Sequence, residues 1–121
     1  MSIPPKTAIV TGASQGIGAG IVKAFAQRGF NVVANSRKVA QSTEVAPSHC
    51  VALVDGHIGE PATAAKIVET ALARFKSIDV LVNNAGIFVV KPFTDYTPDD
   101  LKSLVSTNIE GFLYVTQLAI K

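Results

Sequence analysis

Thr11 to Gly18, TGASQGIG, places three glycines among hydroxyl and amide side chains. The apolar run from Thr7 to Val10 before it predicts a buried strand, and the apolar residues from Ile17 to Gln27 recur with helical periodicity. The glycines therefore lie on a strand-to-helix turn. Gly12 can adopt a backbone conformation closed to other residues, and the two later glycines leave room for a ligand or for helix-strand contact.

A turn of this kind can bind an anion. The first N–H groups of a helix have no partner within the helix, and the positive end of the helix dipole lies at the same place. Both features suit a pyrophosphate. Glycine-rich turns also end many strands for steric reasons alone, so the flanking strand and helix are needed to favour nucleotide binding.

A second candidate group follows the strand predicted at Asn31 to Ala34, about twenty residues beyond the glycines. A dinucleotide fold places there the side chain that recognises the adenosine ribose: an acid for a 2′-hydroxyl, or a basic residue for a 2′-phosphate. The sequence has no acid at this point. Ser36 can donate a hydrogen bond and Arg37 offers a planar fork, which favours NADP over NAD. The alternative is that Arg37 and Lys38 are solvated loop charges.

The rest of the chain alternates between apolar runs and helical patterns, which is typical of a parallel α/β sheet with helices on both faces. Between Val39 and Ser48 any helix is short. The further predicted elements are a strand at Cys50 to Val54, a helix from Pro61 to about Lys76, a strand at Ile78 to Val82, and a helix that starts at Thr97. Its apolar face is expected at Leu101, Leu104 and Val105, and that of the first helix at Ile17, Ile21, Val22, Phe25 and Ala26.

Two of these strands end in residues that suit a ligand. Asp55-Gly56 follows the third strand, where the carboxylate could meet an adenine edge or only end the strand. Asn83-Asn84-Ala85-Gly86 follows the fourth. Its small residues let a ligand lie against the backbone, and its amides can tie neighbouring strand ends together by hydrogen bonds.

TGASQGIG on the first helix and NNAG after the fourth strand, in that order, resemble the short-chain dehydrogenase/reductase family. The resemblance implies a Rossmann-type doubly wound parallel sheet and a Ser, Tyr, Lys and Asn group that moves a hydride between a nicotinamide cofactor and a ketone or secondary alcohol. Thr107 to Phe112 resembles the family's central helix, and Asn108 falls on its catalytic asparagine. Without the resemblance, Asn108 would be interpreted as an ordinary buried or capping amide.

The resemblance also assigns cofactor contacts. They comprise Gly12, Ser14, Gln15, Gly16, Ile17 and Gly18 for the pyrophosphate and ribose, Ser36 and Arg37 for the 2′-phosphate, Asp55 and Gly56 for the adenine, and Asn84, Ala85 and Gly86 for the central part of the cofactor. Two positions depart from the family. Gln15 stands where many NADP-preferring members have Arg or Lys, and Asp55 is followed by Gly56-His57 where an apolar residue and Thr or Ser are usual.

The catalytic Ser and the Tyr-x-x-x-Lys pair are not found. Neither Tyr96 nor Tyr114 has a lysine four residues later, and Lys121 has Gln117 four residues before it. Residues 1–121 are therefore expected to form a single dinucleotide-binding domain, cut before those residues and holding strands one to four in the order 3-2-1-4. The alternative to the cofactor half of an enzyme is a non-enzymatic nucleotide-binding or dimerisation module.

Composition bears on the partner, the location and metal binding. The 121 residues carry a net charge of +2 with 48% apolar residues, and no basic stripe suggests a nucleic-acid partner. No apolar run suits a signal peptide or a membrane span, so a cytoplasmic protein is expected, and by analogy with the family a homo-oligomer. A lone Cys50 and the pair His49 and His57 give no metal site. The substrate is not identified, although apolar residues between Ile87 and Tyr96 suggest part of a pocket wall.

Overall fold

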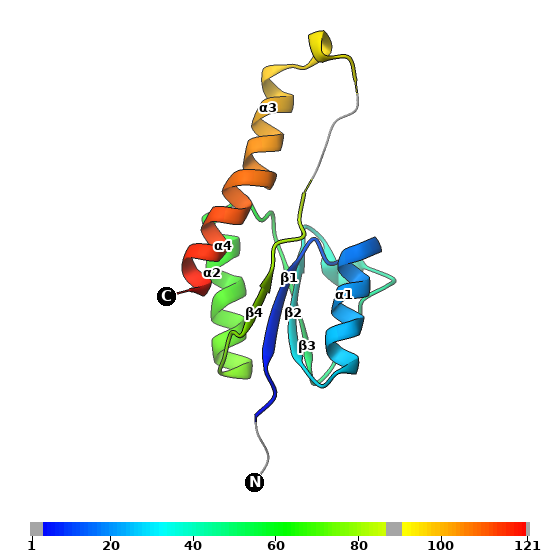
Figure 1. Cartoon of the computed structure of the whole chain (residues 1–121), viewed down its shortest axis with the longest axis vertical. Helices are drawn as coiled ribbons and strands as arrows, with labels where there is room; N and C mark the ends of the chain where they lie inside the picture. Colours follow the sequence, from blue (N-terminus) through cyan, green and yellow to red (C-terminus); the bar gives the residue numbers. More distant parts are fainter. Residues whose placement is uncertain (1–3, 87–90, 121) are drawn as a thin grey trace.

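Short apolar strands form the centre of the molecule. The computed structural model describes residues 4–86 and 91–120. Its strands, all parallel, are β1 (Thr7–Thr11), β2 (Asn31–Ser36), β3 (Val51–Asp55) and β4 (Val80–Val82). They form one sheet in the order β3-β2-β1-β4, shown edge to edge in Figure 1, so the predicted order is confirmed. The chain passes from one side of β1 to the other between β3 and β4, and such a switch point opens a crevice at the carboxyl ends of the strands.

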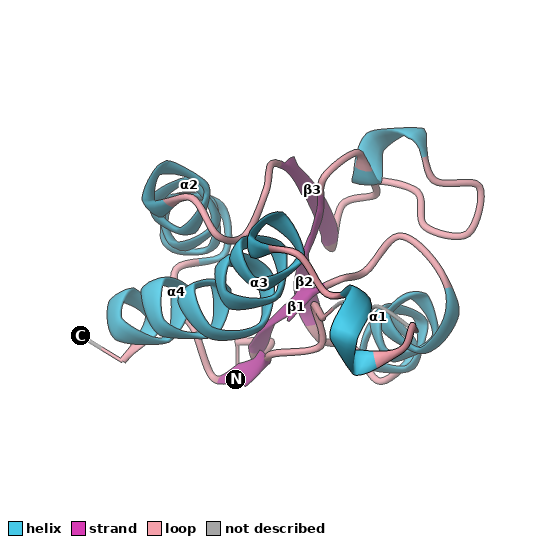
Figure 2. Cartoon of the chain, turned by 90° about the horizontal axis from the view of Figure 1, so that it is seen from above, coloured by secondary structure: helices cyan, strands magenta, loops and turns pink. Residues whose placement is uncertain are grey.

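Helices cover both faces of the sheet. Helix α1 (Gly16–Gln27) lies on one side of the strands, and α2 (Pro61–Thr70) and α4 (Gly111–Ala119) lie together on the other, as Figure 2 shows from above. Alternation along the strands supplies both cores: Val10 and Ala34 pack towards α1, whereas Ile9 and Val33 pack towards α2 and α4. Two-sided burial of this kind explains why the middle residues of each strand are apolar.

The remaining elements extend these helices or are single turns. Helix α2 continues into the π-helical turn η2 (Ala71–Phe75), so the helix predicted from Pro61 is confirmed. Helix α3 (Pro98–Leu104), the π-helical turn η4 (Val105–Glu110) and α4 follow one another as one long helical run. Only the turn η1 (Val39–Gln41) forms between β2 and β3, and η3 (Phe93–Asp95) precedes α3.

All four strands differ from prediction at one end or both. Strand β1 ends at Thr11 and β2 at Ser36, one and two residues later than predicted. Strand β3 runs one residue later than expected, and β4 begins at Val80, not at Ile78. The cause in β4 is Asp79. Its backbone N–H donates to the Thr7 carbonyl oxygen at 2.9 Å, while its carboxylate accepts from the Thr7 N–H at 2.8 Å. The Asp79 carboxylate therefore takes the place of the backbone carbonyl that would accept from the Thr7 N–H in a longer strand.

Two predicted helix faces are wrong in one residue each. Ile17 is 77% exposed, because the first turn of α1 lies at the carboxyl end of the sheet, where no strand side chain covers it. Leu101 is 63% exposed, because α3 rises beyond the sheet (Figure 1). The start of α3 is as predicted: Thr97 Oγ1 accepts from the Asp100 N–H at 3.1 Å, and the Asp100 carboxylate accepts from the Thr97 N–H at 2.9 Å. Within residues 4–86 and 91–120, no helix has the length and apolar character needed to span a membrane.

Candidate functional site

The glycine-rich turn packs directly on the segment after β4. Gly12 has a φ of +64°, and a Cβ added there would lie 2.8 Å from the Ala85 Cα. A Cβ at Gly18 would lie 2.0 Å from the Gly12 carbonyl oxygen. Real Cβ atoms do not approach other atoms so closely. Gly12 and Gly18 are therefore required by contact within the protein. A Cβ added at Gly16 would meet open space, and glycine is favoured there by its φ of +58°.

Hydrogen bonds join the same two segments. The hydroxyl of Thr11 accepts from the N–H groups of Asn84 at 3.2 Å and Ala85 at 3.0 Å, and Asn84 Nδ2 donates to the Gly12 carbonyl oxygen at 3.0 Å. The tie expected of an asparagine after β4 is thus present in Asn84. Thr11 is 1% exposed and was not predicted to take part. Its only sequence signal is a hydroxyl at the end of an apolar strand that leads into glycine.

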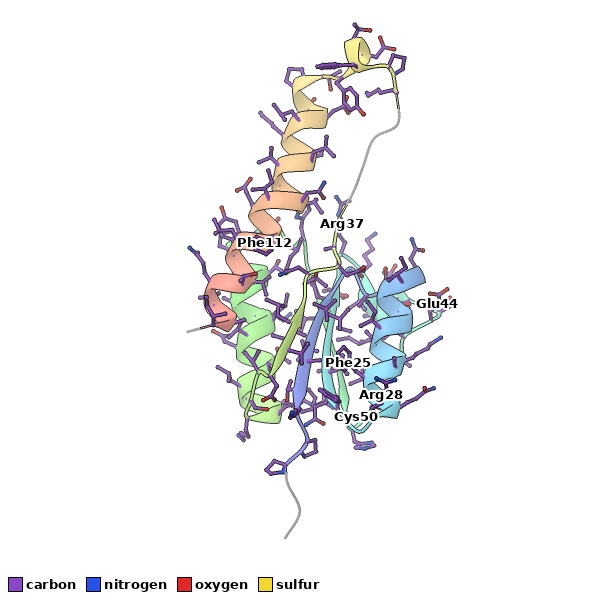
Figure 3. The ribbon with its side chains drawn as sticks, in the orientation of Figure 1. Phe25, Arg28, Arg37, Glu44, Cys50 and Phe112 are labelled. Carbon is purple, nitrogen blue, oxygen red and sulfur yellow. The ribbon has the colours of Figure 1, made fainter. Side chains whose placement is uncertain are left out.

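A cavity of about 220 Å³ opens at the carboxyl ends of the strands. It gathers six of the predicted cofactor residues from all four strand ends: Gly12, Ser36, Arg37, Gly56, Ala85 and Gly86. Figure 3 shows Arg37 at this end of the sheet. Four further residues line it: Asn35, His57, Ile58 and Thr107. The volume is below the range of about 300–1,000 Å³ of whole-ligand pockets, so the cavity can enclose only part of a dinucleotide.

Asn35 holds one wall of this cavity. Its side chain is 1% exposed, and its Nδ2 donates to the carbonyl oxygens of Val54 at 2.9 Å and Gly56 at 3.2 Å. The end of β2 is thereby fixed to the turn after β3. Asp55 Oδ1 accepts from the Ala40 N–H at 2.9 Å, so one oxygen of this predicted adenine contact is bonded to the backbone that follows β2.

Ser14 and Gln15 line a separate cavity of about 300 Å³. Its other walls come from the segment after β2: Lys38, Gln41, Ser42, Thr43 and Glu44. Glu44 Oε2 accepts from the Gly16 N–H at 3.0 Å, and Figure 3 shows Glu44 beside the start of α1. Ser42 Oγ donates to the Ser14 carbonyl oxygen at 2.5 Å. The Glu44 carboxylate thus accepts a hydrogen bond from the first residue of α1, at the helix N-terminus that the sequence predicts to bind a cofactor anion.

Asn108 lies on the π-helical turn η4 and lines a third cavity of about 120 Å³, together with Thr11, Asn83 and Phe112. A Cβ added at Gly86 would lie 3.5 Å from Asn108 Oδ1, so this side chain approaches the segment after β4. Turns of the π type are often found at functional sites. The structure therefore brings Asn108 next to the glycine-rich corner, by which we mean the turn from Thr11 to Gly18 together with the segment from Asn84 to Gly86.

Tyr114, one helical turn beyond η4, has the wrong electrostatics for a general acid. Its hydroxyl donates to Glu110 Oε2 at 2.8 Å, and the nearby carboxylate raises the pKa of Tyr114 above its ordinary value. Of the loop expected to line a substrate pocket, residues 87–90 lie outside the described residues, and Phe93 is 80% exposed.

Known proteins match both the sequence and this arrangement. The model of the family described as short chain dehydrogenase matches residues 6–121. Oxidoreductase UcpA of Escherichia coli is 35% identical over 120 residues, which are 95% of this chain and 45% of that protein. The D-beta-hydroxybutyrate dehydrogenase of Cupriavidus necator is also 35% identical over 120 residues, with coverage of 95% and 46%.

Solved structures agree. The crystal structure of a short-chain dehydrogenase/reductase from Brucella melitensis, described as a glucose/ribitol dehydrogenase, has a TM-score of 0.86 at 30% identity and covers 99% of this chain and 54% of that one. The chain spans about half the length of the relatives it matches. It carries the glycine-rich turn, the Asn84 tie and the parallel sheet of one family over nearly its whole length, and it belongs to the short-chain dehydrogenases.

Proposed function

We propose that this chain is the cofactor-binding half of an oxidoreductase that uses NADP(H) to interconvert a ketone and a secondary alcohol. The observation that carries the proposal is the cavity at the switch point of the sheet, where Gly12, Arg37, Gly56 and Gly86 converge from four strand ends. When bound, the cofactor supplies or accepts the hydride. The substrate class rests on family membership and not on a side chain of this chain.

The residues present fit such a cofactor. Gly12 and Gly18 keep side chains away from the turn, and the open surroundings of Gly16 let a pyrophosphate reach the start of α1. Ser14, Gln15 and Ile17 complete this part of the proposed site. Ser36 and Arg37 hold the 2′-phosphate, and Asp55 with Gly56 meets the adenine. Asn84, Ala85 and Gly86 border the central part of the cofactor.

Asn108 is the one proposed catalytic residue of this chain. In the proposal its amide positions a water molecule for proton transfer, which suits its place beside Gly86 at the small third cavity. The general acid is assigned to a part of the full-length protein outside this chain. Neither tyrosine here is followed by a lysine four residues later, and the Glu110 contact makes Tyr114 a poorer proton donor.

The preference for NADP rests on Arg37 and can be tested by substitution in the full-length protein. In Arg37→Ala we expect the dissociation constant for NADPH to rise about tenfold or more, because a charge-assisted contact to phosphate contributes about 1.5–3 kcal/mol. The dissociation constant for NADH should change less than about threefold. Arg28→Ala is the matched control, since Arg28 is an exposed guanidinium at the far end of α1 (Figure 3).

Nicotinamide fluorescence titration gives the dissociation constants of the unsubstituted protein and of both variants for NADPH and for NADH. Equal losses for NADPH and NADH in Arg37→Ala would remove the basis for NADP preference while leaving nucleotide binding in place. No saturable binding of either cofactor by the unsubstituted protein would contradict the proposed function itself.

A second candidate function, dimerisation through the long helix, is favoured by one observation. Ile109, Phe112 and Leu113 are 60%, 53% and 43% exposed on η4 and α4, and Figure 3 shows Phe112 on the outer side of the helix. Exposed apolar surface of this kind marks association sites. Sedimentation equilibrium with Phe112→Ser tests this candidate: a homo-oligomer that dissociates on substitution supports association through the long helix, and a monomer in both forms contradicts it.

A further inference from the structure

Thr107 has a hydroxyl without a partner. The residue is 8% exposed, and its Oγ1 is the single buried side-chain oxygen or nitrogen within residues 4–86 and 91–120 that makes no hydrogen bond. Asn35 and Thr11, which are also buried in the same region, both have hydrogen-bond partners. Native proteins rarely leave such a group unsatisfied, because it has lost its contact with water and gained nothing in return.

No carbonyl oxygen of the described local backbone accepts a hydrogen bond from this hydroxyl. A threonine within an α-helix commonly donates to the carbonyl oxygen three or four residues before it, as Thr70 does to Lys66 at 2.7 Å. Thr107 lies instead in the π-helical turn η4, and its hydroxyl makes no such bond among the described residues. The hydroxyl is thus free to interact with a group that is brought from outside the helix.

The position of Thr107 indicates what that group is. Thr107 lines the cavity of about 220 Å³ together with Ser36, Arg37 and Gly56, which are the residues proposed to hold the 2′-phosphate and adenine. It also borders the smaller cavity that contains Asn108. Thr107 therefore borders both the cavity that contains Ser36, Arg37 and Gly56 and the cavity beside the proposed catalytic asparagine.

We propose that the Thr107 hydroxyl forms a hydrogen bond with the adenosine half of the dinucleotide, and that this bond satisfies a group left unpaired in the free protein. The inference rests on the proposed function, because it names a further contact in the same cofactor site. A structural hydroxyl would lower stability when removed. A hydroxyl kept for a ligand lowers affinity when removed and leaves the free protein at least as stable.

Two substitutions in the full-length protein separate these roles. Thr107→Val keeps the shape and removes the hydroxyl, whereas Thr107→Ser keeps the hydroxyl and removes a methyl group. Thr70→Val, at the half-buried last residue of α2, is the matched control outside the cavity. Calorimetric titration gives the dissociation constants for NADPH, for 2′,5′-ADP as the adenosine half alone, and for nicotinamide mononucleotide. Thermal unfolding without ligand gives the stability.

We expect Thr107→Val to weaken the binding of NADPH and 2′,5′-ADP by the same factor, about three- to tenfold, as for one lost hydrogen bond. Its affinity for nicotinamide mononucleotide and its Tm without ligand should not fall, and Thr107→Ser should bind nearly as the unsubstituted protein does. Unchanged affinity for 2′,5′-ADP in Thr107→Val would overturn the inference and leave the proposed function standing. If the unsubstituted protein binds neither NADPH nor 2′,5′-ADP, the inference and the proposed function are both overturned.

Discussion

The glycine-rich corner and the long helix that rises above it are built in opposite ways. At the corner, Thr11 and Asn84 bond to neighbouring backbone, and a single methyl group at Gly18 would collide with it. On the helix, Leu101 and Ile109 are each at least 60% exposed. The corner is thus held by hydrogen bonds and close packing within the chain. The outer face of the long helix carries apolar side chains that no described residue covers.

The glycine-rich corner is the part of the molecule whose geometry is fixed by contacts between segments that are distant in the sequence. The corner joins segments about seventy residues apart, so its geometry follows from the sheet order and does not depend on local preference alone. Substitutions at the corner should therefore lower stability and cofactor binding together. Substitutions on the long helix should change stability mainly where they remove a local capping bond or a charge contact.

The largest effect is expected for Gly18→Ala. The new Cβ would lie 2.0 Å from the Gly12 carbonyl oxygen and 2.7 Å from Asn84 Nδ2, so the turn and the segment after β4 must separate. Overpacking of this kind costs about 1–3 kcal/mol or more. Gly20→Ala is the control on the same helix, because nothing lies within 4 Å of the added atom. There we expect a gain of about 0.5–1 kcal/mol from helix preference. Urea unfolding measures both, and equal effects would contradict the close packing of the corner.

Thr11→Val should come next. It retains the size of the side chain but leaves the N–H groups of Asn84 and Ala85 without their acceptor. An unsatisfied buried donor costs about 1–3 kcal/mol. Thr70, half-buried at the end of α2, gives the reference: Thr70→Val should stay within about 0.5 kcal/mol. A loss at Thr11 no larger than that at Thr70, by denaturant titration, would show that the two segments are held by shape alone.

Glu44→Gln tests whether the Glu44 carboxylate competes with a cofactor phosphate for the start of α1. The carboxylate accepts from the Gly16 N–H and places a negative charge where a cofactor phosphate is proposed to bind. Removing that charge should strengthen NADPH binding about two- to fivefold, since a charge at a helix N-terminus contributes about 0.3–1 kcal/mol. Weaker binding by Glu44→Gln in fluorescence titration would mean that Glu44 supports the turn more than it competes with the ligand.

The smallest effect concerns the start of α3, on the exposed side of the comparison. Hydrogen bonds from Lys91 and from the Thr97 backbone lower the pKa of Asp100 below its ordinary value of 3.8. The contribution of Asp100 is therefore present above that ordinary pKa and is lost as pH falls through the lower folded-state value. In Lys91→Ala the pKa of Asp100, followed by carboxyl NMR, should move back towards 3.8. An unchanged pKa would show that Thr97 alone sets it.

Much of this architecture follows from the sequence, because apolar runs and glycine positions are local signals that agree with one another. The strand order, the strand-to-helix turn and the tie at Asn84 are all predicted and found. The contact of Glu44 with Gly16 could not be predicted, since it spans 28 residues and comes from a segment with no periodicity. Thr107 likewise resembles any helical threonine in the sequence, and only the structure shows that it lines the cavity and that its hydroxyl has no partner among the described residues.

The most direct test of the central claim is a fluorescence titration of the full-length protein, its Gly18→Ala variant and its Gly20→Ala variant with NADPH. The account predicts saturable binding by the unsubstituted protein and by Gly20→Ala, and loss of binding by Gly18→Ala, since only the latter forces Gly12 and Asn84 apart. Equal binding by all three, or no binding by the unsubstituted protein, would contradict the assignment of this corner as the cofactor site.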